Sequence, residues 1–286
     1  PMVGAVIVRR GRIIGQGYHQ GPGMPHAEVV ALKAAAGKVS GATLYTNLEP
    51  CCHIDKKTPP CTRALIQHKI RKVVVAMRDP NRRVCGRGLR ELKNAGILLQ
   101  EGILQHEALR LNEAYIKYMT QERPFVILKA AQSLEGKIAT AGGESRWITS
   151  EPARAYTHRL RAEVDAVMIG VGTLLRDNPR LTARTGVKTA RQPLRIVVDS
   201  TLRIPLDAHV MQQSLREKIV VATTSHASQA RIRELEDRGV RVLVVKERQG
   251  HVDLSDLMRV LWEMGVMIVM IEGGSELNAS AIRQGI

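Results

Sequence analysis

A histidine, a glutamate and three cysteines in the first third of the chain have the types and spacing of a metal site. They stand in His26-Ala27-Glu28, Glu49-Pro50-Cys51-Cys52 and Thr58-Pro59-Pro60-Cys61. One histidine and two cysteines supply three zinc ligands and leave the fourth position of the ion for water. An open position of this kind is typical of a catalytic zinc site, whereas four protein ligands close a structural one.

Glu28 is expected to move protons at this site, because it lies too close to His26 to be an obvious fourth ligand. Hydrolytic deamination needs water that is nucleophilic at neutral pH, and a carrier that converts the leaving amine into ammonia. Zinc lowers the pKa of its bound water to about 7, and a glutamate serves as the carrier. The order H-x-E, P-C, C is typical of deaminases of cytosine- and adenine-like rings.

Two questions stay open at the metal site. Adjacent cysteines rarely both point at one ion, and Cys51 is preferred over Cys52 because it follows Pro50, as the deaminase signature requires. The other open point is the kind of site, since a structural zinc knuckle or unligated buried cysteines would use the same residues. The remaining cysteine, Cys85, is expected to be a buried or loop thiol.

The composition suits a globular enzyme of two domains. The chain has 286 residues, 44% of them hydrophobic, and a formal net charge of +16. The basic excess suits anionic partners such as phosphorylated metabolites or nucleic acid. Aromatic residues are scarce at 3% and no basic run occurs, which weakens the nucleic-acid interpretation. Four cysteines gathered near a histidine indicate metal binding in a reducing compartment, and we expect a cytoplasmic protein without a membrane span.

Strands and helices are expected to alternate in both halves, which predicts α/β architecture. In the first half, strands are expected at 2–8, 13–17, 43–48, 72–77 and 97–99, and helices at 26–36, 61–68, 88–95 and 107–119. In the second half, strands are expected at 125–130, 166–169, 196–198, 219–222, 240–245 and 266–271, with a helix at 152–162. Pro124 indicates a break, so we predict domains at 1–122 and 123–286. Both ends look cut, and we expect the second domain to lack its final elements.

Distinctive motifs occur in both halves of the chain. In the first half they are Pro1 to Val8, His26-Ala27-Glu28-Val29, Leu48-Glu49-Pro50-Cys51, Thr58-Pro59-Pro60-Cys61 and Ala76-Met77-Arg78-Asp79-Pro80-Asn81. In the second half they are Leu128-Lys129-Ala130-Ala131, Ser145-Arg146-Trp147-Ile148-Thr149, Asp177-Asn178-Pro179 and Glu272-Gly273-Gly274-Ser275. Together these motifs resemble the RibD (RibG) family of bifunctional riboflavin biosynthesis enzymes. The resemblance implies a cytidine-deaminase-like three-layer α/β domain, followed by a dihydrofolate-reductase-like α/β domain.

The resemblance also implies two reactions and their residues. The first half would deaminate 2,5-diamino-6-(5-phosphoribosylamino)pyrimidin-4-one with zinc on His26, Cys51 and Cys61 and with Glu28 as proton carrier. The second half would reduce the ribosyl group to ribityl with NADPH. Substrate contacts of the deaminase would be His19, Lys57 and Thr58. NADPH contacts would be Ala131, Trp147, Thr173, Asp177, Ser200, Gly274 and Ser275. Substrate contacts of the reductase would be Ser145, Arg161, Leu181, Arg184 and Glu272.

Three departures from the family pattern bear on these roles. Cys51 and Cys61 enclose nine residues where the family has eight, which puts the role of Lys57 in doubt. Glu135 stands where the family has aspartate, and the first helix and final strands of the family are missing from this chain.

The reductase residues also make physical sense by themselves. Gly170-Val171-Gly172-Thr173 and Glu272-Gly273-Gly274-Ser275 each put glycines and a hydroxyl where a strand turns into a helix, so that backbone N–H groups can hold phosphate. Neither is a full G-x-G-x-x-G, and ordinary turn glycines would look the same. Arg161 and Arg184 suit phosphate clamps, because a guanidinium fork matches phosphate oxygens. By dinucleotide-binding logic, Asp199 would favour NADH over NADPH.

Two other classes of function remain as alternatives. A nucleic-acid base deaminase with an appended substrate-docking domain would account for the positive charge, and a zinc-stabilised scaffold would need no Glu28. The leading prediction is the bifunctional enzyme, acting on small phosphorylated pyrimidines as a homo-oligomer whose subunit number the sequence does not give.

Overall fold

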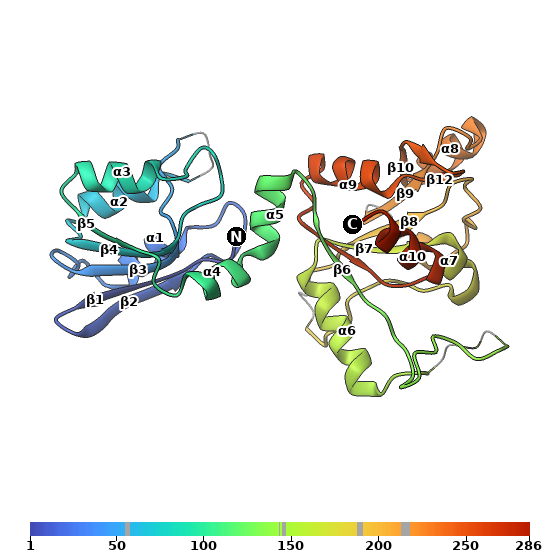
Figure 1. The fold of residues 1–286 in the computed structure, drawn as a ribbon, viewed down its shortest axis with the longest axis horizontal. Coiled ribbons are helices and arrows are strands. Elements are labelled where there is room, and N and C mark those ends of the chain that lie inside the picture. Colours follow the sequence, from blue (N-terminus) through green and yellow to red (C-terminus); the bar gives the residue numbers. More distant parts are fainter. Residues whose placement is uncertain (55–57, 143, 145–146, 188–190, 213–217) are drawn as a thin grey trace. The chain divides into compact units, whose positions relative to one another are not determined.

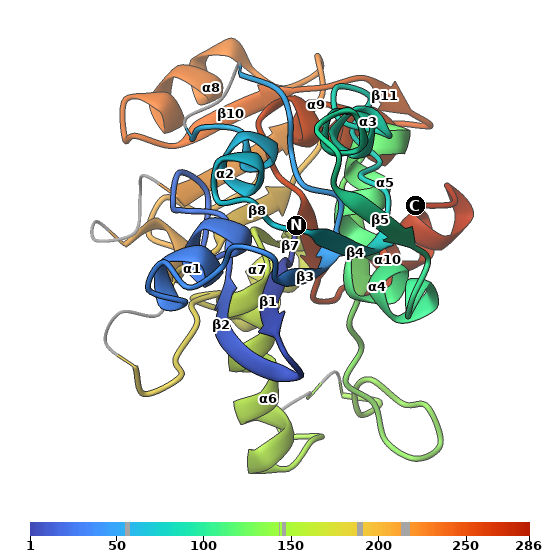
Figure 2. The ribbon, with the colours of Figure 1, turned by 90° about the vertical axis from the view of Figure 1, so that its left-hand side faces the viewer.

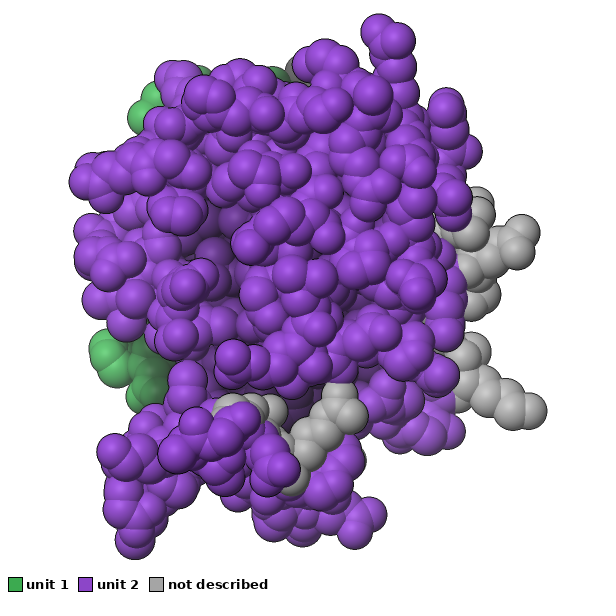
Figure 3. All heavy atoms as spheres, turned by 90° about the vertical axis from the view of Figure 1, so that its right-hand side faces the viewer, with its two compact units in different colours: residues 1–121 green, residues 122–286 purple. Residues whose placement is uncertain are grey.

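The chain folds into two α/β units. The structure, a computed structural model, describes residues 1–286 except 55–57, 143, 145–146, 188–190 and 213–217. One compact unit spans Pro1–Gln121 and the other Glu122–Ile286; Figure 3 colours them separately. The break lies one residue before the predicted one.

The first unit contains one five-stranded mixed sheet. Its strands are β1 (Gly4–Arg9), β2 (Arg12–Tyr18), β3 (Thr43–Leu48), β4 (Lys72–Met77) and β5 (Leu98–Glu101), in the order β2-β1-β3-β4-β5 (Figure 1). The predicted opening hairpin is observed, since β1 pairs antiparallel with both β2 and β3. The strands β3, β4 and β5 are parallel, as their helical connections require.

Helices cover both faces of this sheet, which makes the predicted three layers. The helices are α1 (Ala27–Ala34), α2 (Cys61–Gln67), α3 (Arg87–Asn94), α4 (Gln105–Leu111) and α5 (Glu113–Gln121). Buried side chains of α1, α2 and α3, such as Ala31, Leu65 and Leu92, share one core. Ala108 of α4 packs in a separate core with Leu48, Ala76 and Met77.

Helix α1 approaches β2 so closely that only glycine fits between them. A Cβ on Gly17 would lie 2.6 Å from Val30 Cβ, and one on Gly15 would lie 2.3 Å from Ala31 O. Figure 2 shows the two elements side by side. The glycines of β2 therefore fix the position of the helix that begins with the predicted metal ligand His26.

The second unit contains a fully parallel six-stranded sheet. Its strands are β6 (Phe125–Leu128), β7 (Ala166–Gly170), β8 (Leu194–Val198), β9 (Ile219–Thr223), β10 (Arg241–Val244) and β13 (Ile268–Ile271). They lie in the order β10-β9-β8-β7-β13-β6. The last strand, β13, is inserted between β6 and β7. A small hairpin of β11 (Glu247–Arg248) and β12 (His251–Val252) stands apart from this sheet.

Alternate residues of these strands bury on opposite faces of the sheet. The helices of the unit are α6 (Glu151–Glu163), α7 (Val171–Asp177), α8 (Gln229–Glu236), α9 (Leu254–Glu263) and α10 (Ser275–Arg283), with a short 3-10 turn η1 (His209–Met211). Val167 and Ile169 pack in the core that includes α7 and α8. Met168 packs in the core with α9 and α10. In the described part of the chain, no helix has the length and apolarity to cross a membrane.

Candidate functional site

Three predicted ligands meet at one point in the first unit. His26 is the N-cap of α1, Cys61 is the first residue of α2, and Cys51 follows β3. The Nδ1 of His26 lies 3.4 Å from Cys51 Sγ and 3.3 Å from Cys61 Sγ. A tetrahedral zinc ion would hold such nitrogen and sulfur atoms about 3.5 Å apart. The donor set and its spacing therefore fit a zinc ion bound through Nδ1.

Of the two adjacent cysteines, the structure brings Cys51 to this cluster. His26, Cys51 and Cys61 are the group of metal-binding side chains that meets among the described residues. The Cys61 backbone N–H donates to Cys51 Sγ at 3.4 Å, which favours a thiolate there. Burial, and then the negative charges of Glu91 and Glu49, raise the pKa of the Cys52 thiol. Cys52 is thus outside the cluster and held as a neutral thiol.

Glu28 is the second residue of α1 and is only 3% exposed. Burial raises the pKa of its carboxyl above the ordinary value, and the charge of His26 opposes that shift. A bound zinc ion would oppose it further, because a cation favours the carboxylate. A buried carboxyl beside an open metal position is suited to proton transfer.

His19 and Thr58 both contact the imidazole of His26. The Oγ1 of Thr58 lies 3.1 Å from His26 Nε2. The ring of His19 stands edge-on to that of His26 with centroids 5.2 Å apart, and its Nδ1 donates to Pro25 O at 3.2 Å. The third predicted contact, Lys57, lies outside the described residues.

A buried carboxylate, Glu49, secures the loop that carries Cys51. Its side chain is 2% exposed in total and accepts hydrogen bonds from three backbone N–H groups, those of Asp79, Gly86 and Leu89. A Cβ on Gly88 would lie 2.2 Å from Pro50 O, so α3 also packs directly on this loop. The sequence motif contained Glu49, but its role depends on backbone groups far along the chain, which sequence patterns do not show.

In the second unit, predicted cofactor residues gather at the carboxyl edge of the parallel sheet. Ser200 follows β8, Thr173 follows β7, Gly274 and Ser275 follow β13, and Ala131 follows β6. These four strands are neighbours in the sheet, so the residues after them lie along one edge. Ligands of parallel α/β sheets bind at such edges. Asp177 lies at the far end of α7.

Gly274 leaves a space that suits a cofactor group. Its φ is +87° and that of Gly273 is +119°, conformations that favour glycine. A Cβ on Gly274 would lie 2.8 Å from Thr173 Oγ1. The turn thus keeps the start of α10 open beside a hydroxyl, an arrangement able to hold a phosphate. The residues present therefore fit a dinucleotide.

The remaining predicted cofactor contact, Trp147, lies in the loop before α6. Its side chain is 72% exposed, and the guanidinium of Arg154 lies 4.3 Å from the ring centroid. The arginine also donates to Thr149 O at 2.7 Å. The indole is therefore stacked on one side and open to a ligand.

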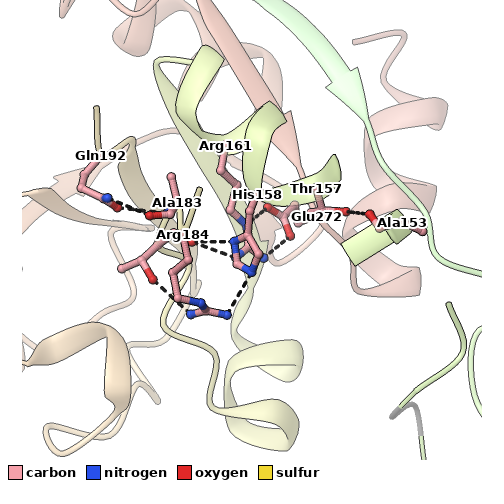
Figure 4. A network of polar contacts seen from close by, with 9 residues as sticks. Ala153, Thr157, His158, Arg161, Ala183, Arg184, Gln192 and Glu272 are labelled. Carbon is pink, nitrogen blue, oxygen red and sulfur yellow. Dashed lines mark hydrogen bonds and ion pairs between the residues drawn. The ribbon is translucent and has the colours of Figure 1, made fainter. Parts of the chain in front are cut away.

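Three predicted substrate residues of the reductase, Arg161, Arg184 and Glu272, lie in one polar network, shown in Figure 4. Arg161 and Glu272 make a two-pronged ion pair, with Nη2 2.6 Å from Oε2 and side chains 13% and 4% exposed. Arg184 donates to Thr182 Oγ1 at 3.2 Å. The side chain of Leu181 is in the core and its φ is 55°, so a contact there would use its backbone. Ser145 lies outside the described residues.

Asp199 does not act as the acidic residue of a dinucleotide fingerprint. It is 1% exposed, and its Oδ2 accepts the backbone N–H of Ile204 at 2.8 Å. Burial raises the pKa of this carboxyl above its ordinary value. Asp199 is therefore used inside the loop after β8, and the sequence pattern no longer gives a reason to expect NADH.

His158 is the residue of this network that sequence reasoning missed. Its Nδ1 lies 3.1 Å from Thr182 O and its Nε2 lies 3.1 Å from Arg184 Nη2. The sequence offered one signal, because His158 precedes the predicted Arg161 by three residues and so shares its helix face.

Two family models match the chain. Residues 124–286 match the RibD C-terminal domain, and residues 1–77 match the cytidine and deoxycytidylate deaminase zinc-binding region. The riboflavin biosynthesis protein RibD of Aquifex aeolicus is 44% identical over 285 residues, which are 100% of this chain and 78% of that protein. RibD of Actinobacillus pleuropneumoniae is 46% identical over 286 residues, 100% of this chain and 75% of the relative.

Solved structures agree with these matches. Acinetobacter baumannii RibD superposes with a TM-score of 0.88 and 38% identity, over 99% of this chain and 77% of the other. A diaminohydroxyphosphoribosylaminopyrimidine deaminase/5-amino-6-(5-phosphoribosylamino)uracil reductase of Thermotoga maritima gives a TM-score of 0.85 and 37% identity, over 98% and 76%. The likeness extends over both units.

Proposed function

Because the chain belongs to the RibD family and is a bifunctional riboflavin biosynthesis enzyme with deaminase and reductase domains, we propose that these domains are residues 1–122 and 123–286. The first reaction is the hydrolytic deamination of 2,5-diamino-6-(5-phosphoribosylamino)pyrimidin-4-one. The second is the NADPH-dependent reduction of the ribosyl group to ribityl. The observation that carries this division of labour is the cluster of His26, Cys51 and Cys61 in the first unit.

In the deaminase, His26, Cys51 and Cys61 hold zinc, and bound zinc supplies a Lewis acid that makes water nucleophilic at neutral pH. Glu28 accepts the proton of the attacking water on a carboxylate oxygen. It returns this proton to the amino group, which leaves as ammonia. The burial of Glu28 supports this role, because it shields the proton from bulk solvent.

His19, Lys57 and Thr58 are the proposed contacts of the deaminase substrate. His19 stands beside the metal ligand and its Nδ1 is used by Pro25 O, which leaves Nε2 for a substrate group. Thr58 already has a partner in His26, so it serves the metal ligand as well as the substrate. Lys57 would meet the substrate phosphate.

In the reductase, NADPH contacts are Ala131, Trp147, Thr173, Asp177, Ser200, Gly274 and Ser275. Five of these residues follow four neighbouring strands, which supports one continuous cofactor edge. The nicotinamide, when bound, supplies hydride to the sugar carbonyl. The backbone N–H groups at the start of α10 hold cofactor phosphate, and the open face of Trp147 orients a ring of the cofactor.

The reductase substrate contacts are Ser145, Arg161, Leu181, Arg184 and Glu272. The guanidinium of Arg161 forms an ion pair with the carboxylate of Glu272, so the two side chains together carry no net charge. The hydrogen-bond partners of Arg184 within the described residues, Thr182 and His158, are neutral, so Arg184 supplies the positive charge for the phosphate. A positively charged, exposed guanidinium beside a buried ion pair supports recognition of a phosphorylated sugar.

The proposed partners are small phosphorylated pyrimidines, without nucleic acid or membrane. Scarce aromatic residues support the exclusion of nucleic acid. We also propose a homo-oligomer, and a cytoplasmic location, because cysteines that are not joined in disulfides suit a reducing compartment. Sedimentation of the zinc-loaded protein, with and without single-stranded DNA, tests the homo-oligomer and the absence of nucleic-acid binding.

The decisive experiment separates the two activities in one chain. Glu28→Gln should lower deamination about 10²–10⁴-fold and leave zinc content and the reduction of the pre-deaminated substrate unchanged. Ammonia release and substrate-dependent NADPH oxidation measure the two steps. If both activities are lost in a zinc-loaded, folded variant, the assignment of the steps to separate units is wrong.

A further inference from the structure

His158 lies between the two arginines of the reductase network. It stands on α6 one turn before Arg161, so both side chains project from the same face of the helix (Figure 4). The segment that carries Thr182 and Arg184 packs across this face. One backbone atom, Thr182 O, accepts hydrogen bonds from His158 Nδ1 and from Arg161 Nη1, both at 3.1 Å.

The partners of His158 allow a single protonation state. Thr182 O is a carbonyl and can only accept, so Nδ1 must carry a proton. The Nη2 of Arg184 can only donate, so Nε2 must offer its lone pair. His158 is therefore a neutral imidazole in one tautomer, and its Nε2 acts as the acceptor that holds the guanidinium.

The positive charge of this network rests on Arg184. Glu272 neutralises Arg161, whereas Arg184 bonds to the hydroxyl of Thr182 and the neutral imidazole of His158. No ion pair of Arg184 occurs within the described ranges. Arg184 also borders an open depression of about 320 Å³, whose other lining residues are Pro152, Ala155, Arg159 and Thr185. An anion is the ligand that such a guanidinium requires.

We propose that neutral His158 is a positioning residue of the reductase, which holds the Arg184 guanidinium in the orientation that binds the phosphate of the phosphoribosyl substrate. This inference rests on the proposed function, in which Arg184 contacts that substrate. Without the imidazole, Arg184 keeps its bond to Thr182 as its one side-chain hydrogen bond among the described residues, and it samples other rotamers at a cost in substrate affinity.

Acid should undo this arrangement. Burial first, and then the charges of Arg161 and Arg184, lower the pKa of His158, while Thr182 O and the Glu272 carboxylate raise it. A proton on Nε2 would place an N–H group against the N–H of Arg184. The positioning is therefore complete above the ordinary pKa of histidine and is lost as the pH falls through the lowered pKa of His158.

The test compares steady-state kinetics of His158→Leu, His158→Gln and Arg184→Ala, with pre-deaminated substrate and NADPH. His158→Leu should raise the KM for the phosphorylated substrate about tenfold and leave kcat and the KM for NADPH within about twofold. His158→Gln keeps a non-titrating acceptor and should resemble the wild type. His226→Leu is the matched control, because His226 pairs with Glu247 elsewhere in the same unit. Tryptophan fluorescence shows that the second unit of each variant is folded, because Trp147 and Trp262 both lie in this unit.

Two further measurements distinguish a positioning role of His158 from a purely structural role. The KM of the wild type for the phosphorylated substrate should rise at acid pH more steeply than the KM of His158→Gln. The substrate phosphate itself titrates near pH 6 and affects both proteins. The profile of His158→Gln therefore shows the contribution of the phosphate alone. His158→Leu combined with Arg184→Ala should be no worse than Arg184→Ala alone.

A wild-type KM in His158→Leu, or additive effects in the double variant, would overturn the inference and leave the proposed role of Arg184 intact. A wild-type KM in Arg184→Ala would instead refute the proposed substrate contact, and the inference with it.

Discussion

The hydroxyl of Thr58 and the two cysteine sulfurs contact different nitrogens of the His26 imidazole. Thr58 Oγ1 lies 3.1 Å from Nε2, whereas both sulfurs lie within 3.4 Å of Nδ1. A histidine that binds metal through one nitrogen carries its proton on the other, and the partner of that proton fixes the tautomer and the ring orientation. Thr58 is therefore placed to prepare the ligand as well as to meet a substrate.

Replacement of Thr58 by valine keeps the shape of the side chain and removes the acceptor. We expect the affinity for zinc to fall about tenfold, at the lower end of the effect of such outer partners. Competition with a chromophoric chelator measures this affinity, and Thr58→Ser should retain it. Wild-type affinity in Thr58→Val would mean that the hydroxyl serves only the substrate.

Serine variants at the two adjacent cysteines identify the ligand. Cys51→Ser should weaken zinc binding by more than about tenfold and abolish deamination, because the hydroxyl is a poor replacement for a thiolate. Cys52→Ser should keep zinc and activity, since Cys52 lies outside the cluster. Metal analysis after dialysis decides the matter, and retention of zinc in Cys51→Ser would exclude Cys51 as a ligand.

A methyl group at Gly88 should disturb the loop that carries the metal ligand Cys51. Its Cβ would lie 2.2 Å from Pro50 O and 3.2 Å from Glu49 Oε1, next to the Cys51 ligand. We expect Gly88→Ala to lower the free energy of unfolding by about 1–3 kcal/mol and to accelerate zinc release. Denaturant titration with a zinc indicator follows both effects. Gly4→Ala, where nothing lies within 4 Å of the added carbon, is the control and should change neither.

The variant Glu272→Ala, which removes the carboxylate, should have a less stable second unit than the wild type. Arg161 would be left largely buried without its ion partner, and we expect a loss of about 3 kcal/mol in the free energy of unfolding. Both tryptophans, Trp147 and Trp262, lie in this unit, so tryptophan fluorescence reports its unfolding alone. Glu247→Ala breaks a more exposed pair and should cost under about 1 kcal/mol. Equal losses in the two variants would show that the buried pair contributes no more to the free energy of unfolding than the exposed pair.

Local patterns predicted most elements because each strand and helix carries its own periodicity. The residues 43–48 and 72–77 were predicted as strands and are β3 and β4. The expected single helix at 107–119 is wrong in one respect, since it is divided at Asn112 into α4 and α5. The side chain of Asn112 bonds to the backbone of Met2, which lies 110 residues away. No local pattern contains such a contact.

The site was predictable where spacing along one element carries the chemistry. His26 and Glu28 stand at the start of one helix, and their motif indicated metal and proton transfer directly. Glu49, His158 and Asp199 could not be understood in that way. Each owes its role to partners on other segments, such as the backbone N–H of Leu89 for Glu49 and the guanidinium of Arg184 for His158.

The insertion of β13 between β6 and β7 has a consequence for the order of synthesis. The ribosome makes β6 long before β13, because β7 to β12 lie between them in the chain, yet Ile268 must pair with Phe125. The pairing of β6 with β13 therefore waits until β13 has emerged, whereas β1 to β5 of the first unit all precede Gln121. During translation the deaminase half can fold while its neighbour still exposes unpaired strand edges. That interval is when the nascent chain depends most on chaperones.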